Sequence, residues 1–151
     1  MNDKRRTLLT GMIATLALSG CAQLNLKPND KIFLDADVLF EFGKHTLKPE
    51  GRRQIQQYVP SIKMRGETWV TVIGHTDRIG NQRANDALSL RRAEAVREVL
   101  VAEGLMADRV SARGAGSRNP VVECPDQPRN QLIQCLAPNR RVEINISEVR
   151  W

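Results

Sequence analysis

The sequence predicts an α/β (α+β) domain, a two-layer sandwich of helices on a small mixed sheet. Strand-like and helical segments follow one another in the order strand, helix, strand, helix, strand, long connection, strand. Alternation of this kind is typical of helices that cover one shared sheet. The 151 residues leave room for one domain of ordinary size. We therefore expect a single βαβαβ-β unit.

The first strand and first helix are predicted from composition and from end signals. Residues 32–42 are rich in Ile, Leu, Val and Phe and predict a strand with a break near Ala36-Asp37. The sequence KPE at 48–50 places proline at the first helical position and an acid in the first turn. Pro60 should end or kink this helix, and Gly66 is a natural stop.

The remaining elements follow from hydrophobic patterns. Residues 69–73 are continuously apolar or β-branched and predict a strand buried on both faces. A helix over residues 84–103 should end at Glu103-Gly104. Residues 109–115 predict a short strand, and residues 142–146 alternate between apolar and polar side chains as a half-buried strand does.

Residues 1–20 have the features of a bacterial lipoprotein signal peptide: a basic start, a short apolar segment and small residues before Cys21. Cys21 would then become the lipidated N-terminus, and Ala22 after it favours the outer membrane. A plain secretory signal with an unrelated Cys21 is the alternative. Residues 21–30 are polar and predict a tether. The folded domain is expected over residues 31–151.

Charge and cysteine usage narrow the function classes. Removal of residues 1–20 leaves a net charge of +4, which is too mild and too scattered for a nucleic-acid-binding protein. The remaining cysteines, Cys124 and Cys135, are an even number in a chain that reads as exported, so we expect a disulfide. It would close part of the proline-rich connection at 117–138. We expect no metal and no cofactor, because the two cysteines have no nearby histidine or second pair.

One arginine of the long helix lies on its apolar side. At about 100° per residue, Leu88, Val96 and the other apolar residues of 84–103 form a core-facing stripe, and Arg92 falls in its middle. Arg91 lies at the edge of the stripe and reaches water. A buried guanidinium costs several kcal/mol unless it is paired, so Arg92 requires a partner.

Polar residues precede and begin the same helix. Thr76, Asp77, Asn81 and Asn85 follow the strand at 69–73, where ligands of α/β domains commonly bind. Asp77 is the nearest candidate partner for the buried arginine. Spacing leaves two alternatives open: an internal salt bridge, or a pair that grips a ligand carrying both an ammonium and a carboxylate.

Four ordered motifs resemble the OmpA-like peptidoglycan-binding domain family. They are GHTDRIG at 74–80, LSLRRA at 88–93, RVSARGAG at 109–116 and LAPNRRVEI at 136–144. The resemblance extends from about Phe33 to Ile146, and the cysteine-bearing connection is similar to an insertion in the enterobacterial OmpA periplasmic domain. The resemblance implies an α/β sandwich that binds the diaminopimelate of the peptidoglycan stem peptide.

The resemblance also implies site residues. Asp77 and Arg92 would hold the diaminopimelate, Thr76 and Asn85 would support the pocket, and the segment Phe42-Gly43-Lys44 would line it. The family often has asparagine where this chain has Gly43. A bound diaminopimelate presents an ammonium and a carboxylate on one carbon, whereas lysine lacks that carboxylate.

The sequence thus predicts a lipoprotein, anchored in the outer membrane by N-terminal acylation (palmitate), whose periplasmic domain binds peptidoglycan of the meso-diaminopimelate type. Catalysis is not expected, because His75 beside Asp77 lacks an accompanying nucleophile or third group. The alternative is an envelope lipoprotein that acts mainly as an interaction or assembly component of a larger machine. Partners among envelope proteins are compatible with both.

Overall fold

The computed structural model describes residues 30–148. The predicted signal peptide at 1–20, the lipidation at Cys21 and the tether up to residue 29 lie outside the described residues. The elements in chain order are β1 (Lys31–Asp35), α1 (Ala36–Leu39), α2 (Pro49–Lys63), β2 (Thr68–Gly74), α3 (Gln82–Ala102), β3 (Val110–Gly114), α4 (Arg129–Cys135), the 3-10 turn η1 (Ala137–Asn139) and β4 (Arg141–Glu148).

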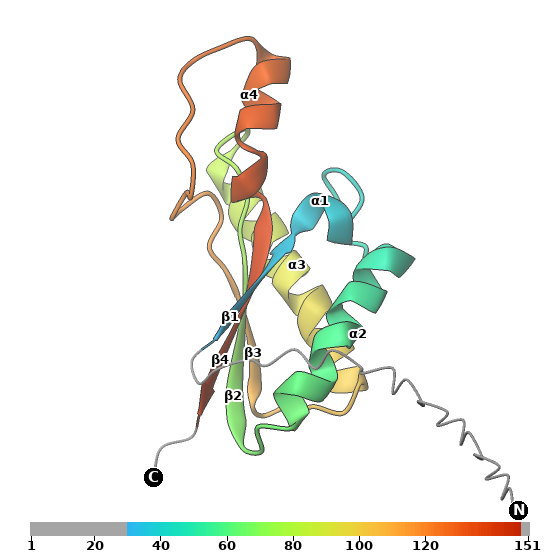
Figure 1. The fold of residues 1–151 in the computed structure, drawn as a ribbon. Helices are drawn as coiled ribbons and strands as arrows, with labels where there is room; N and C mark the ends of the chain where they lie inside the picture. The colour runs from blue at the N-terminus through green and yellow to red at the C-terminus, as the bar shows by residue number, and fades with distance from the viewer. Residues whose placement is uncertain (1–29, 149–151) are drawn as a thin grey trace, which may run out of the picture.

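The strands form one mixed sheet in the order β1-β4-β2-β3. β2 and β3 are parallel, whereas β4 runs antiparallel to both of its neighbours. Helices α2 and α3 lie on the same side of this sheet, and α4 projects beyond one end of it (Figure 1). The predicted two-layer α/β fold is confirmed. Within residues 30–148, no helix combines the length and apolar composition needed to cross a bilayer.

The core fills the space between the sheet and the two long helices. Val142, Ile144 and Ile146 of β4 are buried there, as the alternation of residues 142–146 predicted. They meet buried residues of α2, β2 and α3: Ile55, Val59, Ile62, Val70, Val72, Val96, Val99 and Leu100. Burial of this apolar surface supplies the main driving force of the fold.

The first predicted strand is shorter than expected. β1 ends at Asp35, whose carboxylate accepts a hydrogen bond from the backbone N–H of Asp37 and so begins the short helix α1. The break near Ala36-Asp37 is confirmed, but residues beyond it are not a continuation of the strand. Phe40 makes only an isolated bridge with Leu47. The apolar run concealed this change because Leu39, at the end of α1, and Phe40, in the isolated bridge, are both core residues.

Pro60 does not end α2, which runs on to Lys63. The side chain of Pro60 faces solvent while Val59 and Ile62 face the core. Proline removes one helical hydrogen bond, and water can replace that bond on the exposed side of a helix. The predicted start at Pro49 and the predicted C-terminus of the next helix at Glu103 are both confirmed.

The expectation that β2 is buried on both faces is wrong. Val70 and Val72 are buried against the helices, but Trp69 on the opposite face remains 49% exposed. Thr71 and Ile73 on that outer face are half-buried. A run of β-branched residues therefore marked strand propensity rather than a second covering layer.

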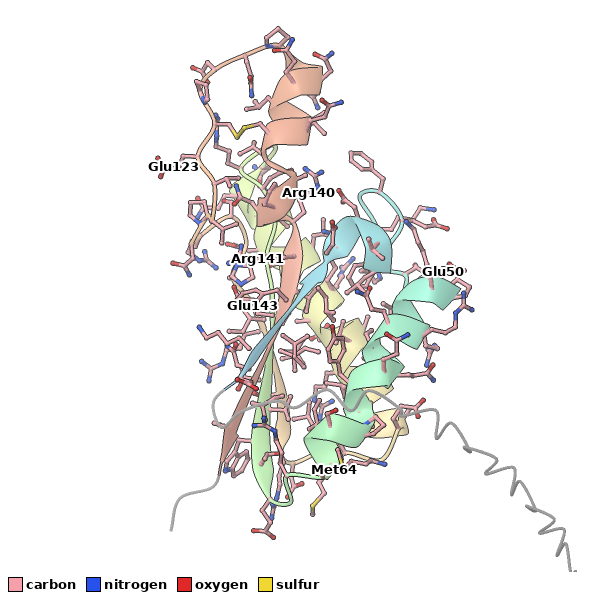
Figure 2. All side chains as sticks on the ribbon, viewed as in Figure 1. Glu50, Met64, Glu123, Arg140, Arg141 and Glu143 are labelled. Atoms are coloured by element: carbon pink, nitrogen blue, oxygen red, sulfur yellow. A yellow bond between two sulfur atoms is a disulfide. The ribbon has the colours of Figure 1, made fainter. Side chains whose placement is uncertain are left out.

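The outer face instead holds a buried polar cluster of His75, Arg141 and Glu143. Nε and Nη2 of Arg141 donate to one carboxylate oxygen of Glu143 at 2.9 and 2.6 Å. Nε2 of His75 lies 3.3 Å from the same oxygen, and His75 is 3% exposed. Figure 2 shows Arg141 and Glu143 on the side of the sheet away from α2. The alternation in β4 predicted polar side chains in solvent, but Arg141 and Glu143 are each 8% exposed. Nη2 of Arg141 also donates to the backbone carbonyl of Asn119 at 3.3 Å.

Burial lowers the pKa of His75 from 6.5, and the charge of Arg141 lowers it further. The charge of Glu143 and a backbone contact with Arg118 raise this pKa but do not outweigh the first two effects. The folded chain therefore favours neutral His75, and its contribution to stability is present above the unfolded pKa and lost as the pH falls below it. From about pH 7.5 to about pH 5.5, wild type should lose more stability than His75→Asn.

Urea unfolding across this pH range measures the effect. The exposed His45 lies outside the cluster, so His45→Asn is the matched control and should follow the wild-type profile. Equal pH profiles for wild type and His75→Asn would contradict the assignment.

Candidate ligand-binding site

A hollow of about 200 Å³ opens at the carboxyl end of β2, between the start of α3, the segment after α1, and α4. Its lining combines charged, polar and apolar side chains: Asp37, Phe42, Gly43, Thr76, Asp77, Ile79, Asn85, Leu88, Arg92, Arg129, Ile133 and Arg140. The residues predicted to form the ligand pocket are thus brought together in one place.

The turn between β2 and α3 is held by its own side chains. Oδ1 of Asp77 accepts the backbone N–H of Ile79 at 2.9 Å, and the amide of Asn85 donates to the carbonyl oxygens of Asp77 and Ile79 at 3.2 Å each. Asn81 caps α3, because its side chain accepts the N–H groups of residues 83 and 84. Asn85 therefore shapes the hollow, whereas Asn81 serves the helix and does not line the hollow.

Asp77 pairs with Arg140 and not with Arg92, so the alternative of an internal Asp77–Arg92 salt bridge is wrong. Nη1 of Arg140 donates to Oδ2 of Asp77 at 2.9 Å, and Nη2 donates to Oδ2 of Asp37 at 2.7 Å. Nε of Arg140 lies 3.1 Å from both oxygens of Asp37. Hydrogen bonds to Asp37 and then to Asp77 raise the pKa of Arg140. One guanidinium thus bridges two carboxylates.

Arg92 is buried without an ionic partner of this kind. It is 3% exposed, whereas Arg91 is exposed, as the helical phase predicted. Its Nε donates to the carbonyl oxygen of Lys44 at 3.0 Å, and its guanidinium lies 5.3 Å from the ring centroid of Phe40. Within residues 30–148, its two Nη atoms make no ion pair. Arg92 lines the hollow.

The charges around Arg92 act from a distance. Burial lowers the pKa of Arg92; Asp37 opposes this effect, the charge of Arg140 adds to it, and Asp77 opposes it again. Asp37, Asp77 and Arg140 together carry one net negative charge, and Arg92 carries one positive charge. The inner part of the hollow is therefore dipolar and complements a group with an ammonium and a carboxylate close together.

The remaining predicted residues line the hollow in different ways. Thr76 is buried, and its hydroxyl oxygen has no hydrogen-bond partner among the described residues. Phe42 is 79% exposed at the rim. Gly43 has φ of +69°, and a Cβ there would meet nothing within 4 Å. Asparagine, which the resemblance leads one to expect there, is among the few other residues that tolerate this conformation. The departure thus preserves the backbone while removing a side chain from the rim.

Six lining residues were not among the predicted site residues: Asp37, Ile79, Leu88, Arg129, Ile133 and Arg140. Arg140 belongs to the motif LAPNRRVEI and directly precedes the last strand, and Asp37 marks the break after the first strand. A search for charged residues able to pair with Asp77 and Arg92 could have found both Arg140 and Asp37. Such a search could not have found Arg129 and Ile133, because residues 117–138 were predicted as a connection without a helix. That prediction is wrong, since α4 lies within this segment.

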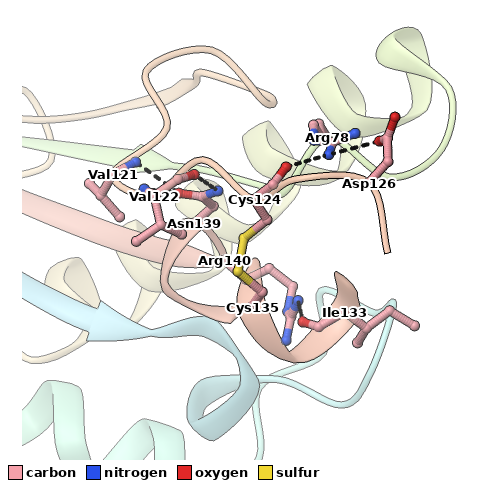
Figure 3. The surroundings of a disulfide bond; sticks show 9 residues. All are labelled: Arg78, Val121, Val122, Cys124, Asp126, Ile133, Cys135, Asn139 and Arg140. Atoms are coloured by element: carbon pink, nitrogen blue, oxygen red, sulfur yellow. Dashed lines mark hydrogen bonds and ion pairs between the residues drawn. A yellow bond between two sulfur atoms is a disulfide. The ribbon is translucent and has the colours of Figure 1, made fainter. Parts of the chain in front are cut away.

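The connection is stapled by the predicted disulfide between Cys124 and Cys135 (Figure 3). Asn139 also holds the first part of the connection. Its amide oxygen accepts the N–H groups of Val121 and Val122, and its amide nitrogen donates to the carbonyl oxygen of Val122. Leu132 and Ile133 are half-buried in α4, which gives this short helix a packing face. The disulfide therefore helps to hold α4 in place at one side of the hollow.

A two-layer α/β domain with a hollow lined by opposite charges at the end of a strand has the form of a ligand-binding module. The chain belongs to the OmpA family, whose sequence profile matches residues 39–133. It is 44% identical to Outer membrane protein A of Salmonella typhi over 122 residues, which cover 78% of this chain and 35% of that protein. The chain thus spans about a third of the length of this relative.

Solved structures have the same fold. The peptidoglycan-associated lipoprotein of Burkholderia pseudomallei is 27% identical with a TM-score of 0.61, covering 73% of this chain and 88% of that one. The cell wall anchor of the T6SS of Pseudomonas aeruginosa is 26% identical with a TM-score of 0.65, covering 79% and 81%.

The two arginines of the hollow should differ in their effect on stability. Arg140→Gln leaves two carboxylates without their shared partner and should lower the free energy of unfolding by on the order of 3 kcal/mol. Arg92→Gln removes a buried cation that has no ion pair and should lower it by less than about 1 kcal/mol, or raise it. Urea unfolding of both variants measures the difference. A larger loss for Arg92→Gln than for Arg140→Gln would refute the assigned pairing.

The disulfide should stabilise the domain and its hollow. The cysteines are 11 positions apart, and a loop of this size is worth on the order of 3 kcal/mol in the chain-entropy account. The double variant Cys124→Ser/Cys135→Ser should lose stability of about this size. Thermal unfolding with and without reductant measures it, since reductant should destabilise only the wild type. A reductant effect of equal size on the double variant would show that the loss has another source.

Proposed function

We propose that the hollow binds the diaminopimelate of peptidoglycan stem peptides without catalysing a reaction. The observation that carries the proposal is the guanidinium of Arg92, which is buried beside the Asp37–Arg140–Asp77 bridge and makes no ion pair within the described part of the chain. The free end of diaminopimelate offers an ammonium to the two carboxylates and a carboxylate to Arg92. Both charges of the ligand then replace their water with charge-assisted hydrogen bonds.

The same arrangement accounts for selectivity. A stem peptide with lysine presents the ammonium but no carboxylate, so Arg92 stays buried and unpaired. Loss of one partner of a buried, hydrogen-bonded charge pair costs about 2–5 kcal/mol. Peptidoglycan of the diaminopimelate type is therefore the proposed ligand.

The names of similar proteins support wall binding. The Burkholderia pseudomallei neighbour is described as peptidoglycan-associated, and the Pseudomonas aeruginosa neighbour as a cell wall anchor. Both are more than 25% identical to this chain, and both cover most of the folded domain. The proposal extends their association with the wall to this chain through named residues.

The proposed role is a tether between the outer membrane and the wall. Acylation of Cys21 would anchor the chain in the membrane, and the domain would face the periplasm. Two or three charge-assisted bonds of about 1.5–3 kcal/mol each give modest affinity once ordering costs are subtracted. Many anchored copies facing one continuous polymer gain from effective concentration, so weak single sites suffice.

Nothing among the described lining residues favours catalysis. His75, the residue that invites an acid–base role, does not line the hollow and lies against Glu143 instead. The lining holds no serine or cysteine, and the hydroxyl of Thr76 has no hydrogen-bond partner among the described residues that could act as its base. The charged lining groups suit binding of a zwitterion.

Sedimentation with isolated diaminopimelate-type peptidoglycan tests the proposal. Wild type should sediment with the wall, and Asp77→Ala and Arg92→Ala should lose most of this binding. Arg91→Ala is the matched control, because it removes the exposed neighbour of Arg92 on the same helix. If both site variants remain folded and still sediment like wild type, the hollow is not the wall-binding site.

A further inference from the structure

We infer that α4 adds a second anion subsite to the hollow, in which Arg129 binds a carboxylate of the wall peptide outside the diaminopimelate tip. This inference rests on the proposed function and extends it, because it assigns the outer part of the hollow to a different group of the same ligand.

The charged residues of the lining do not balance. Asp37, Asp77, Arg92 and Arg140 sum to zero, which matches the zero net charge of the diaminopimelate tip. Arg129 is the one further charged residue of the lining, so the whole hollow has one surplus positive charge. A ligand that fills it is therefore expected to carry one more negative charge than the tip alone.

The surroundings of Arg129 carry the second step. The side chain is exposed, and it makes no ion pair with any residue of 30–148. It lines the same hollow as Ile133, one turn further along α4, and as Leu88 of α3. A peptide that inserts the diaminopimelate tip would pass its methylene groups along these apolar side chains and bring its next polar groups toward Arg129.

The position of α4 is fixed before the ligand arrives. The disulfide holds Cys135 at the end of α4, and Nη1 of Arg140 donates to the carbonyl oxygen of Ile133 at 3.0 Å. Nη2 of Arg78 donates to the carbonyl oxygen of Cys124 at 2.9 Å on the other arm (Figure 3). Arg129 is therefore presented on a wall tied to the same arginine that bridges the inner carboxylates. A preorganised wall reduces the ordering cost of binding.

The ligand chemistry offers suitable groups. In the tripeptide L-alanyl-γ-D-glutamyl-meso-diaminopimelate, the glutamyl α-carboxylate and the terminal carboxylate both lie outside the diaminopimelate tip. Arg129 can form two parallel hydrogen bonds with either group, because a guanidinium matches the geometry of a carboxylate. An amide at the same place accepts a hydrogen bond but brings no charge.

Titration calorimetry with synthetic tripeptides tests the inference. The probes are the free tripeptide, two analogues that each carry one of the two outer carboxylates as an amide, and one analogue with both amidated. Arg129→Gln should weaken binding of the free tripeptide by roughly three- to tenfold and should leave binding of the doubly amidated analogue unchanged. The single amidation that produces the same loss identifies the carboxylate.

The matched control is Arg113→Gln, an exposed arginine of β3 that does not line the hollow. It removes the same surface charge and should bind all four probes like wild type. Equal losses for Arg129→Gln and Arg113→Gln, or a loss that persists with the doubly amidated analogue, would overturn the inference while leaving the proposed function intact. Failure of wild type to bind the free tripeptide would overturn both.

Discussion

The bridge that Arg140 makes between Asp37 and Asp77 organises the rest of the site. It joins α1, the turn after β2, the start of β4 and, through Ile133, the helix α4. These segments are far apart in sequence, and their side chains meet at one guanidinium. Because both carboxylates form their ion pairs with Arg140, Arg92 makes no ion pair with any residue of 30–148 and feels their charge only from a distance. The hollow is thus dipolar before any ligand arrives.

Under the proposed function, this arrangement exchanges some stability for ligand binding. A buried cation that makes no ion pair with any residue of 30–148 is a cost to the free protein, and Arg92 of α3 lies in the middle of an apolar stripe. The backbone hydrogen bond to Lys44 and the contact with Phe40 offset part of that cost. The stapled α4 then closes one side of the hollow, so that most of the ordering needed for binding is completed during folding.

Much of the fold and part of the site could be predicted from the sequence. The helical phase placed Arg92 in the core and Arg91 in solvent, and alternation placed the core residues of β4, because both depend on local periodicity. The partner of Asp77 could not be found in this way, since Arg140 is distant in the chain and only the register of β4 brings it to the turn. The helix α4 was hidden in a proline-rich connection that gave no capping signal.

We propose that Arg92 is held without an ion pair among residues 30–148 so that a ligand carboxylate can pair with it. The most direct measurement compares the affinities of otherwise identical stem peptides with diaminopimelate and with lysine, for wild type and for Arg92→Gln. The account predicts a wild-type preference for diaminopimelate of at least about thirtyfold, which falls close to unity in Arg92→Gln. A preference that survives the loss of Arg92 would contradict it.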